Sequence, residues 1–177
     1  MTIVWIDQSG FLLQPTRRRT WALSGHTPIH PVWNRHDRLS VQAAITLPPR
    51  RKRLGVYFRL YEHNIDAQDV VSFVGHLLRM IRRKVVLIWD RWSVHRAAVA
   101  ILQTRYPDQL EVEWIPAYAP ELNPVEQVWN HTKYGHLANF IPDHIDDLTD
   151  AAMMSITTQH HDNNLIRGFF KYAQLKL

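Results

Sequence analysis

Three carboxylates stand where segments of the chain end or begin, which is where side chains of different elements can meet. Asp7 ends the apolar run TIVWID (2–7), Asp90 ends VVLIWD (85–90), and Glu126 lies just after Asn123-Pro124. Two carboxylates on adjacent strands repel each other unless a cation lies between them. Oxygen ligands in a chain without cysteine suit Mg²⁺ or Mn²⁺, and a third carboxylate would help to hold a second ion.

Each of these residues also has a simpler interpretation. In the simpler interpretation, Asp90 caps the next helix or turns the chain and has no role in chemistry. The pattern Asn-x-x-Glu ending at Glu126 is like a capping box, in which Glu126 would bind no more than the backbone N–H of Asn123. Glu121 competes with Glu126 for the third position, but it lies in an expected loop and is less well aimed.

The first third of the chain predicts antiparallel strands. After the strand that ends at Asp7, Gln8-Ser9-Gly10 reads as a turn, and 11–14 could return as a second strand. Residues 40–47 and 54–61 alternate between apolar and polar with period two, which is typical of strands. Between them, PPRRKR (48–53) reads as a basic hairpin loop, and Ser24 to Arg38 reads as loop.

The rest of the chain predicts helices that alternate with parallel strands. The expected elements are a helix capped by Asp66, the strand ending at Asp90, a helix at 95–105, a strand at 110–115, a helix from about Pro124, and helices at 143–157 and 163–175. A strand–helix–strand unit pairs its strands in parallel. We therefore expect an α/β fold: a mixed five-stranded sheet, three antiparallel strands then a parallel βαβ unit, flanked by helices. In this sheet the first strand can lie beside the strand ending at Asp90, which would bring Asp7 close to Asp90.

Composition narrows the classes of partner. The 177 residues suit one domain, 1–177, with C-terminal helices in 143–177, and 46% of them are hydrophobic. No apolar run reaches the roughly 20 residues of a membrane helix, and the N-terminus does not look like a signal peptide. The net charge is +5 and the pI about 9.7, which favours a nucleic-acid partner.

Three segments together resemble a known family. WIDQSGF, VVLIWDRWSVHR and IPAYAPELNPVEQVWNHTK are similar to the signature blocks of mariner-type and related bacterial insertion-sequence transposases, which belong to the DDE superfamily. TWALSGHTP (20–28) also resembles that family between its first two strands. Asp90 and Glu126 are separated by 35 residues (91–125), close to the family's spacing. The resemblance covers nearly the whole chain and is thinnest after about residue 142.

The resemblance implies a ribonuclease-H-like core in which Asp7, Asp90 and Glu126 are catalytic and hold two Mg²⁺ (or Mn²⁺) ions. Such a site would cut phosphodiester bonds at the ends of a DNA element with water, and would join the 3′-hydroxyls to target DNA. The expected partners are element ends and target DNA, and a homodimer could bring two ends together. We expect a cytoplasmic, nucleoid-associated bacterial protein.

Other residues are candidates for contacts with DNA. They are Arg17, Arg18, Arg19, Arg50, Arg51, Lys52, Arg53, Trp92, His95 and Lys133. The arginine runs could instead be solvated loops, and Trp92 could be packing rather than a stacking platform for a base. His95 could touch a phosphate, support Asp90, or simply be satisfied by backbone at a helix start. Trp129 is expected to pack its helix onto the sheet.

Family members carry helix-turn-helix domains ahead of the core, but here Met1 lies six residues before Asp7. We therefore expect no such domain in this chain, and a separate chain could supply it. Two other functions remain open: a structure-specific nuclease of the same fold, and an inactive remnant that only binds DNA or a partner.

Overall fold

A computed structural model describes residues 1–14, 16–26, 29, 37–117 and 119–177. Its centre is a five-stranded sheet in the order β3-β2-β1-β4-β5. The strands are β1 (Thr2–Leu12), β2 (Arg38–Leu47), β3 (Gly55–Tyr61), β4 (Val85–Trp89) and β5 (Leu110–Trp114). β1, β2 and β3 pair antiparallel, whereas β4 pairs parallel with both β1 and β5. This confirms the predicted mixed sheet, including the place of β1 beside β4.

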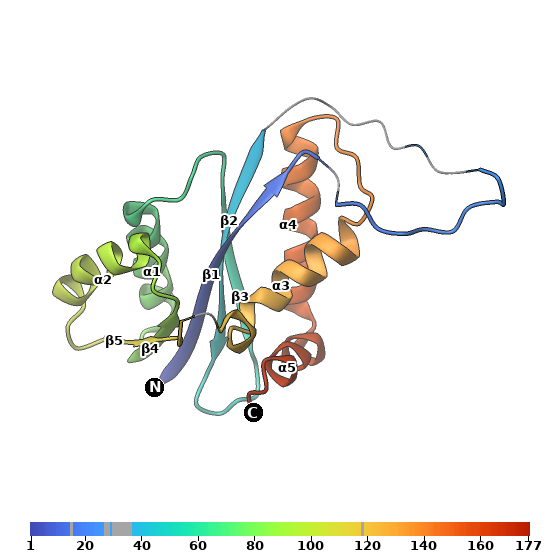
Figure 1. Ribbon diagram of the computed structural model, residues 1–177. Helices are drawn as coiled ribbons and strands as arrows, with labels where there is room; N and C mark the ends of the chain where they lie inside the picture. Colours follow the sequence, from blue (N-terminus) through green and yellow to red (C-terminus); the bar gives the residue numbers. More distant parts are fainter. Residues whose placement is uncertain (15, 27–28, 30–36, 118) are drawn as a thin grey trace.

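Helices cover both faces of the sheet (Figure 1). They are α1 (Ala67–Ile81), α2 (Ser93–Arg105), α3 (Val125–His131), α4 (Ile145–His161) and α5 (Asn163–Tyr172), with a 3₁₀ turn at Pro120–Leu122 and a π-helical turn at Thr132–His136. α1 and α2 pack on one face, and α3, α4 and α5 pack on the other. Both faces of the central strands are therefore buried, which fixes the strand register because a slip by one residue would exchange the faces.

Alternation along β2 explains how one strand serves two cores. Val41, Ala43 and Ile45 belong to the core under α3, α4 and α5, whereas Ala44 belongs to the core under α1 and α2. In the first core the rings of Trp5 and of Phe170 on α5 form an edge-to-face pair, with ring centroids 5.0 Å apart. Offset and edge contacts of this kind are the favoured arrangement of aromatic pairs.

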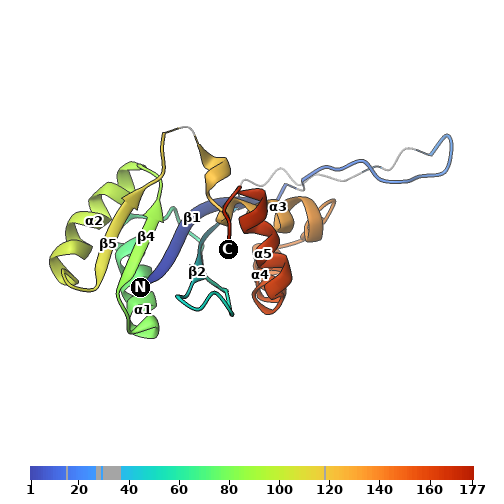
Figure 2. The same ribbon diagram turned by 90° about the horizontal axis from the view of Figure 1, so that it is seen from below.

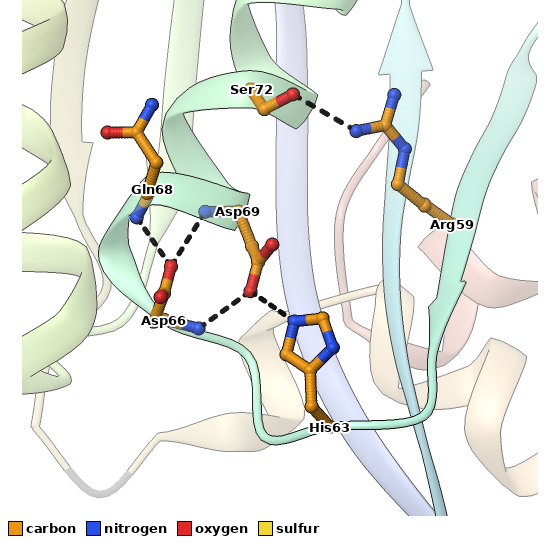
Figure 3. Close-up of polar contacts among 6 residues, drawn as sticks. All are labelled: Arg59, His63, Asp66, Gln68, Asp69 and Ser72. Atoms are coloured by element: carbon orange, nitrogen blue, oxygen red, sulfur yellow. Dashed lines mark hydrogen bonds and ion pairs between the residues drawn. The ribbon is translucent and has the colours of Figure 1, made fainter.

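The start of α1 is fixed by Asp66, as the sequence predicts, and the structure adds that Asp66 forms a capping box with Asp69. The Asp66 carboxylate accepts hydrogen bonds from the backbone N–H groups of Gln68 and Asp69, at 2.8 and 2.9 Å, and the Asp69 carboxylate accepts one from Asp66 N–H (Figure 3). Figure 3 also shows Nε2 of His63, which lies 3.0 Å from Asp69 Oδ2. A reciprocal cap satisfies donors that a helix start otherwise leaves unpaired, so α1 starts at a defined point beside β3.

The turn predicted at Gln8-Ser9-Gly10 is wrong, and so is the separate returning strand predicted after it. β1 runs unbroken through these residues to Leu12, and 8–10 pair in order with residues 42, 41 and 40 of β2. Local turn preference is weaker here than a complete ladder of backbone hydrogen bonds. A glycine also suits position 10, because a Cβ there would lie only 2.6 Å from Nε of Arg38.

Two further predictions concern the loop expected before β2 and the lack of a membrane-spanning segment. Residues 27–28 and 30–36 of the loop expected at Ser24–Arg38, and part of TWALSGHTP, lie outside the described residues. Within the described part, no helix is long and apolar enough to cross a membrane.

Candidate active site

Asp7 lies in the interior part of β1, which pairs with β4 at the centre of the sheet. Its Oδ2 accepts a hydrogen bond from Nε1–H of Trp129 on α3, at 2.9 Å. Burial raises the pKa of Asp7 to about 7, and the negative charge of Glu126 contributes to the rise. Asp7 is therefore a carboxylate that the fold holds in a place where its charge is unfavourable unless something positive approaches it.

Asp90 follows directly after β4, where the chain leaves the sheet. Its Oδ1 accepts a hydrogen bond from the backbone N–H of Trp92, at 2.9 Å, and lies 2.6 Å from Nδ1 of His95. The hydrogen bond from His95 is the main reason why the pKa of Asp90 lies below its usual value. The same fold therefore treats its two aspartates in opposite ways: Asp90 is held ionised, and Asp7 is held against ionisation.

His95 connects the two strands that carry the aspartates. It has no exposed surface, and its ring stacks on Trp89 of β4 with centroids 4.6 Å apart. Its Nε2 lies 2.8 Å from Oε1 of Gln8, the residue after Asp7. His95 thus supports Asp90 from inside the protein and is not placed at the surface where a DNA phosphate would lie.

Glu126 lies in the first turn of α3, and Asn123 fixes that turn to β1. The side chain of Asn123 donates to the backbone oxygen of Ile6 at 3.2 Å and accepts from Val125 N–H at 3.1 Å. The backbone N–H of Asn123 donates to the carbonyl of Pro120 at 2.9 Å. The capping-box interpretation of Glu126 is therefore wrong, because the N–H group that it would bind is already paired and Asn123 caps the turn with its own side chain.

Lys133 supplies positive charge to this group of carboxylates. Burial raises the pKa of Glu126, and the positive charge of Lys133 acts in the opposite direction. Burial lowers the pKa of Lys133, which Glu126 and Asp7 partly offset. Nζ of Lys133 donates to Oγ of Ser9 at 2.6 Å, so the lysine, just after α3, is held against β1.

The three carboxylates line one cavity of about 200 Å³, together with Asn123 and Trp92. Glu121, the competing candidate, lies outside this lining and is exposed. A neighbouring cavity of about 340 Å³ is lined by both aspartates and Arg38. Among the residues that the structure describes, however, no three His, Asp or Glu side chains are gathered closely enough to hold a metal ion.

The remaining candidates for DNA contacts lie in three places. Trp92 is 44% exposed and lines both cavities beside the aspartates. The arginines at 17–19 are exposed, and the guanidinium of Arg18 lies over the ring of Tyr134, 5.4 Å from its centroid. The basic residues at 50–53 are exposed in the β2–β3 loop, beside the start of β1.

The polar partners of the carboxylates are not predicted from the sequence. Trp129 packs α3 onto the sheet as expected, with only 3% of its surface exposed, but it also donates to Asp7. Gln8, in the segment predicted as a turn, instead contacts His95. The nearness of these two residues in sequence to Glu126 and Asp7 is the one available signal, since no pattern specifies a partner more than 80 residues away.

Comparison with known proteins shows several solved structures that this chain resembles. They include the Mos1 mariner paired end complex with Mn (TM-score 0.71, 19% identity, covering 97% of this chain and 52% of that chain) and the Mos1 strand transfer complex (TM-score 0.68, 18%, 97% and 51%). The simian T-cell lymphotropic virus intasome in complex with a PP2A regulatory subunit is also similar (TM-score 0.54, 14%, 91% and 49%). This chain spans about half the length of these structures, and the likeness shows that it shares their fold.

The comparison with curated proteins found no match. The family model described as DDE superfamily endonuclease matches residues 2–149, and the chain therefore belongs to the DDE superfamily endonuclease family.

Proposed function

We propose that this chain is the metal-dependent catalytic core of a DNA transposase, with Asp7, Asp90 and Glu126 as its catalytic carboxylates. The observation that carries the proposal is that one cavity is lined by all three, drawn from β1, the end of β4 and the start of α3. Membership of the DDE endonuclease family supports the reaction class. Solved structures of the same fold include complexes named for paired transposon ends and for strand transfer.

The donor set fits a divalent cation. Carboxylate oxygens are the ligands that Mg²⁺ and Mn²⁺ prefer, and the raised pKa of Asp7 marks a carboxylate that a nearby cation would stabilise. Asp7, Asp90 and Glu126 would hold one ion or two. When bound, such ions supply activation of the attacking oxygen and stabilisation of the leaving oxygen in phosphodiester chemistry.

The protein's own residues would then position the carboxylates. His95 and Trp92 N–H hold Asp90 Oδ1, which leaves Asp90 Oδ2 for a ligand in the cavity. Trp129 holds Asp7 Oδ2 in a similar way. Each aspartate is thereby oriented by a fixed donor, as the residues around a metal site orient its ligands.

The wider role is part of the same proposal. Water as nucleophile would cleave element ends, and a DNA 3′-hydroxyl as nucleophile would give joining to target DNA. Neighbours of this fold were solved with Mn and with Mg, which fits two-ion chemistry here. We propose further that a helix-turn-helix part and a second copy of the chain act together with this core. The substrate would be a bacterial insertion element, and the reaction would take place at the nucleoid.

The proposal is tested with the purified chain, a supercoiled plasmid and a labelled oligonucleotide that carries a free 3′-hydroxyl. With Mn²⁺, plasmid nicking and joining of the oligonucleotide should be lost in Asp7→Asn, Asp90→Asn and Glu126→Gln, while binding of DNA in chelator stays within about twofold. Glu121→Gln is the matched control, because it removes one carboxylate outside the cavity and should retain activity. Metal-dependent activity that persists in both aspartate variants would overturn the assignment.

Adding branched DNA and RNA–DNA hybrid substrates to the assay separates the other two functions. Nicking of branched or hybrid substrates without any joining would favour a structure-specific nuclease. DNA binding without turnover under any metal would favour a remnant that only binds.

A further inference from the structure

Another cavity lies at the opposite end of the sheet from the carboxylates. It measures about 820 Å³ and is lined by the β2–β3 loop, the end of α1 and the end of α4, with Arg50, Arg53, Tyr57, Arg83, His160 and His161 among its residues. Figure 2, which views that end of the molecule, shows the β2–β3 loop in teal between α1 and the pair α4 and α5. Thr2, the first residue of β1, also lines this cavity, five residues before Asp7.

The lining carries charge of one sign. Arg50, Arg53 and Arg83 come from two separate parts of the chain, and no Asp or Glu lines the cavity. Each of the three arginines is exposed, and no ion pair joins any of them to a carboxylate within the described residues. Guanidinium groups without a carboxylate partner form a strong site for phosphate, which they bind through paired N–H donors.

The loop that carries Arg50 and Arg53 is held in place. The side chain of Asn163 at the start of α5 donates to the backbone oxygen of Lys52 at 3.0 Å, and Arg167 donates to the backbone oxygen of Arg51. Nδ1 of His160 lies 2.7 Å from the backbone oxygen of Val56, just after the loop. Two side-chain contacts from α5 therefore hold the loop and one from α4 holds the strand that follows it, and holding the loop reduces the entropy that a ligand must overcome.

We propose that this cavity, which we call the basic cleft, binds the sugar-phosphate backbone of duplex DNA at a place separate from the bond that is cut. The identity of the partner rests on the proposed function. A strand rises about 3.3 Å per residue, so Thr2 lies roughly 17 Å from Asp7, or about five base pairs of B-form DNA at 3.4 Å each. The bound segment is therefore not the scissile phosphate.

The chemistry of the basic cleft makes this binding independent of sequence. Its cationic donors are guanidinium groups, and Tyr57 is the single Phe, Tyr or Trp residue in its lining. One such ring is not a platform for successive stacked bases, which single-stranded DNA would require. Contacts to phosphate fix position and supply affinity but do not read bases.

The test measures the affinity of the full chain for a duplex of about 30 base pairs between about 50 and 200 mM salt, in chelator so that no cleavage can occur. The double variant Arg53→Gln/Arg83→Gln removes two charges from the basic cleft. The matched control Arg96→Gln/Arg105→Gln removes two charges from the exposed surface of α2. If each cleft arginine neutralises one phosphate, the slope of log K against log salt should become shallower by about 1.8 in the cleft variant and stay unchanged in the control.

Every outcome bears on the proposal. An equal change in both variants would mean that net charge alone drives binding, and an unchanged slope in both would mean that the cleft holds no phosphate; either result overturns it. The loss of DNA affinity in the cleft variant should be the same for duplexes of unrelated sequence. A loss of affinity confined to one sequence also contradicts the inference. Because the assay involves no catalysis, a chain that binds through the cleft but never cuts DNA would sink the proposed function alone.

Discussion

Replacing Asp7 by asparagine should make the metal-free protein more stable at alkaline pH, although the same change should abolish cleavage. The fold raises the pKa of this carboxyl from 3.8 to about 7, first by burial and then by the charge of Glu126. A pKa that differs by one between the folded and unfolded states corresponds to about 1.36 kcal/mol, so ionised Asp7 lowers the free energy of unfolding by on the order of 4 kcal/mol. That is a large part of the roughly 5–15 kcal/mol by which domains are stable.

The sign follows from proton binding. Folded Asp7 holds its proton more tightly than unfolded Asp7, so the free energy of unfolding falls as pH rises from about 4 to about 7. Below about pH 4 the residue is neutral in both states, and Asp7→Asn should change little. Above about pH 7 the wild type carries the penalty of a buried charge and the variant does not, because asparagine is neutral. The amide oxygen of asparagine can still accept the hydrogen bond from Trp129.

Urea unfolding at about pH 5 and pH 8 in chelator measures the difference. The advantage of Asp7→Asn over wild type should grow by about 2–3 kcal/mol between these two values of pH. Asp90→Asn is the control of opposite sign: the pKa of Asp90 is lowered by His95, so this variant should be less stable than wild type at both. An advantage of Asp7→Asn that is the same at both values of pH would refute the reasoning.

Three further substitutions test the residues around the carboxylates. Trp129→Phe keeps the aromatic packing but removes the donor to Asp7, so urea unfolding at about pH 8 should show a loss of about 1.5–3 kcal/mol; a loss that is absent would mean that the bond contributes nothing. His95→Phe keeps a ring stacked on Trp89 but removes the polar contacts with Asp90 and Gln8. Mn²⁺-dependent nicking should therefore fall at least about tenfold while the circular dichroism is unchanged. Full activity would show that His95 does not position Asp90. Lys133→Met removes the charge that opposes the raised pKa of Glu126, so the pH of half-maximal nicking should move upward, and an unmoved profile would contradict the pairing.

The sheet can be predicted from the sequence because its signals are local. The run 85–89 carries no charge and 110–114 alternates between apolar and charged residues, so each segment indicates its own burial. The structure accordingly buries Leu110 and exposes Glu111 and Glu113. The N-cap at Asp66 is equally local. The prediction at Gln8-Ser9-Gly10 fails because the conformation of this segment depends on a partner strand about 30 residues away, which outweighs its own preference for a turn.

The site can be predicted only as far as its carboxylates. Asp7, Asp90 and Glu126 are visible because the first two follow apolar runs and the third follows a helix-start pattern, and the fold then brings all three to one cavity although Asp7 lies inside β1. What controls their charge is not visible: the donor to Asp7 lies 122 residues away, and Gln8 lies 87 residues from His95. Such contacts depend on the angle at which α3 and α2 cross the sheet, and no periodicity in the sequence encodes that angle.

The opposite electrostatics of the two aspartates suggest how the site divides its work. Asp90 has a lowered pKa and is fixed by His95, so it carries its negative charge at neutral pH without a cation beside it. Asp7 loses its proton only near pH 7, so its ionisation and the approach of positive charge should favour each other. Stability lost at a buried carboxylate is a common cost of a functional site. In this chain the loss of stability falls on Asp7. Asp7→Asn should therefore raise the free energy of unfolding at alkaline pH and also abolish cleavage.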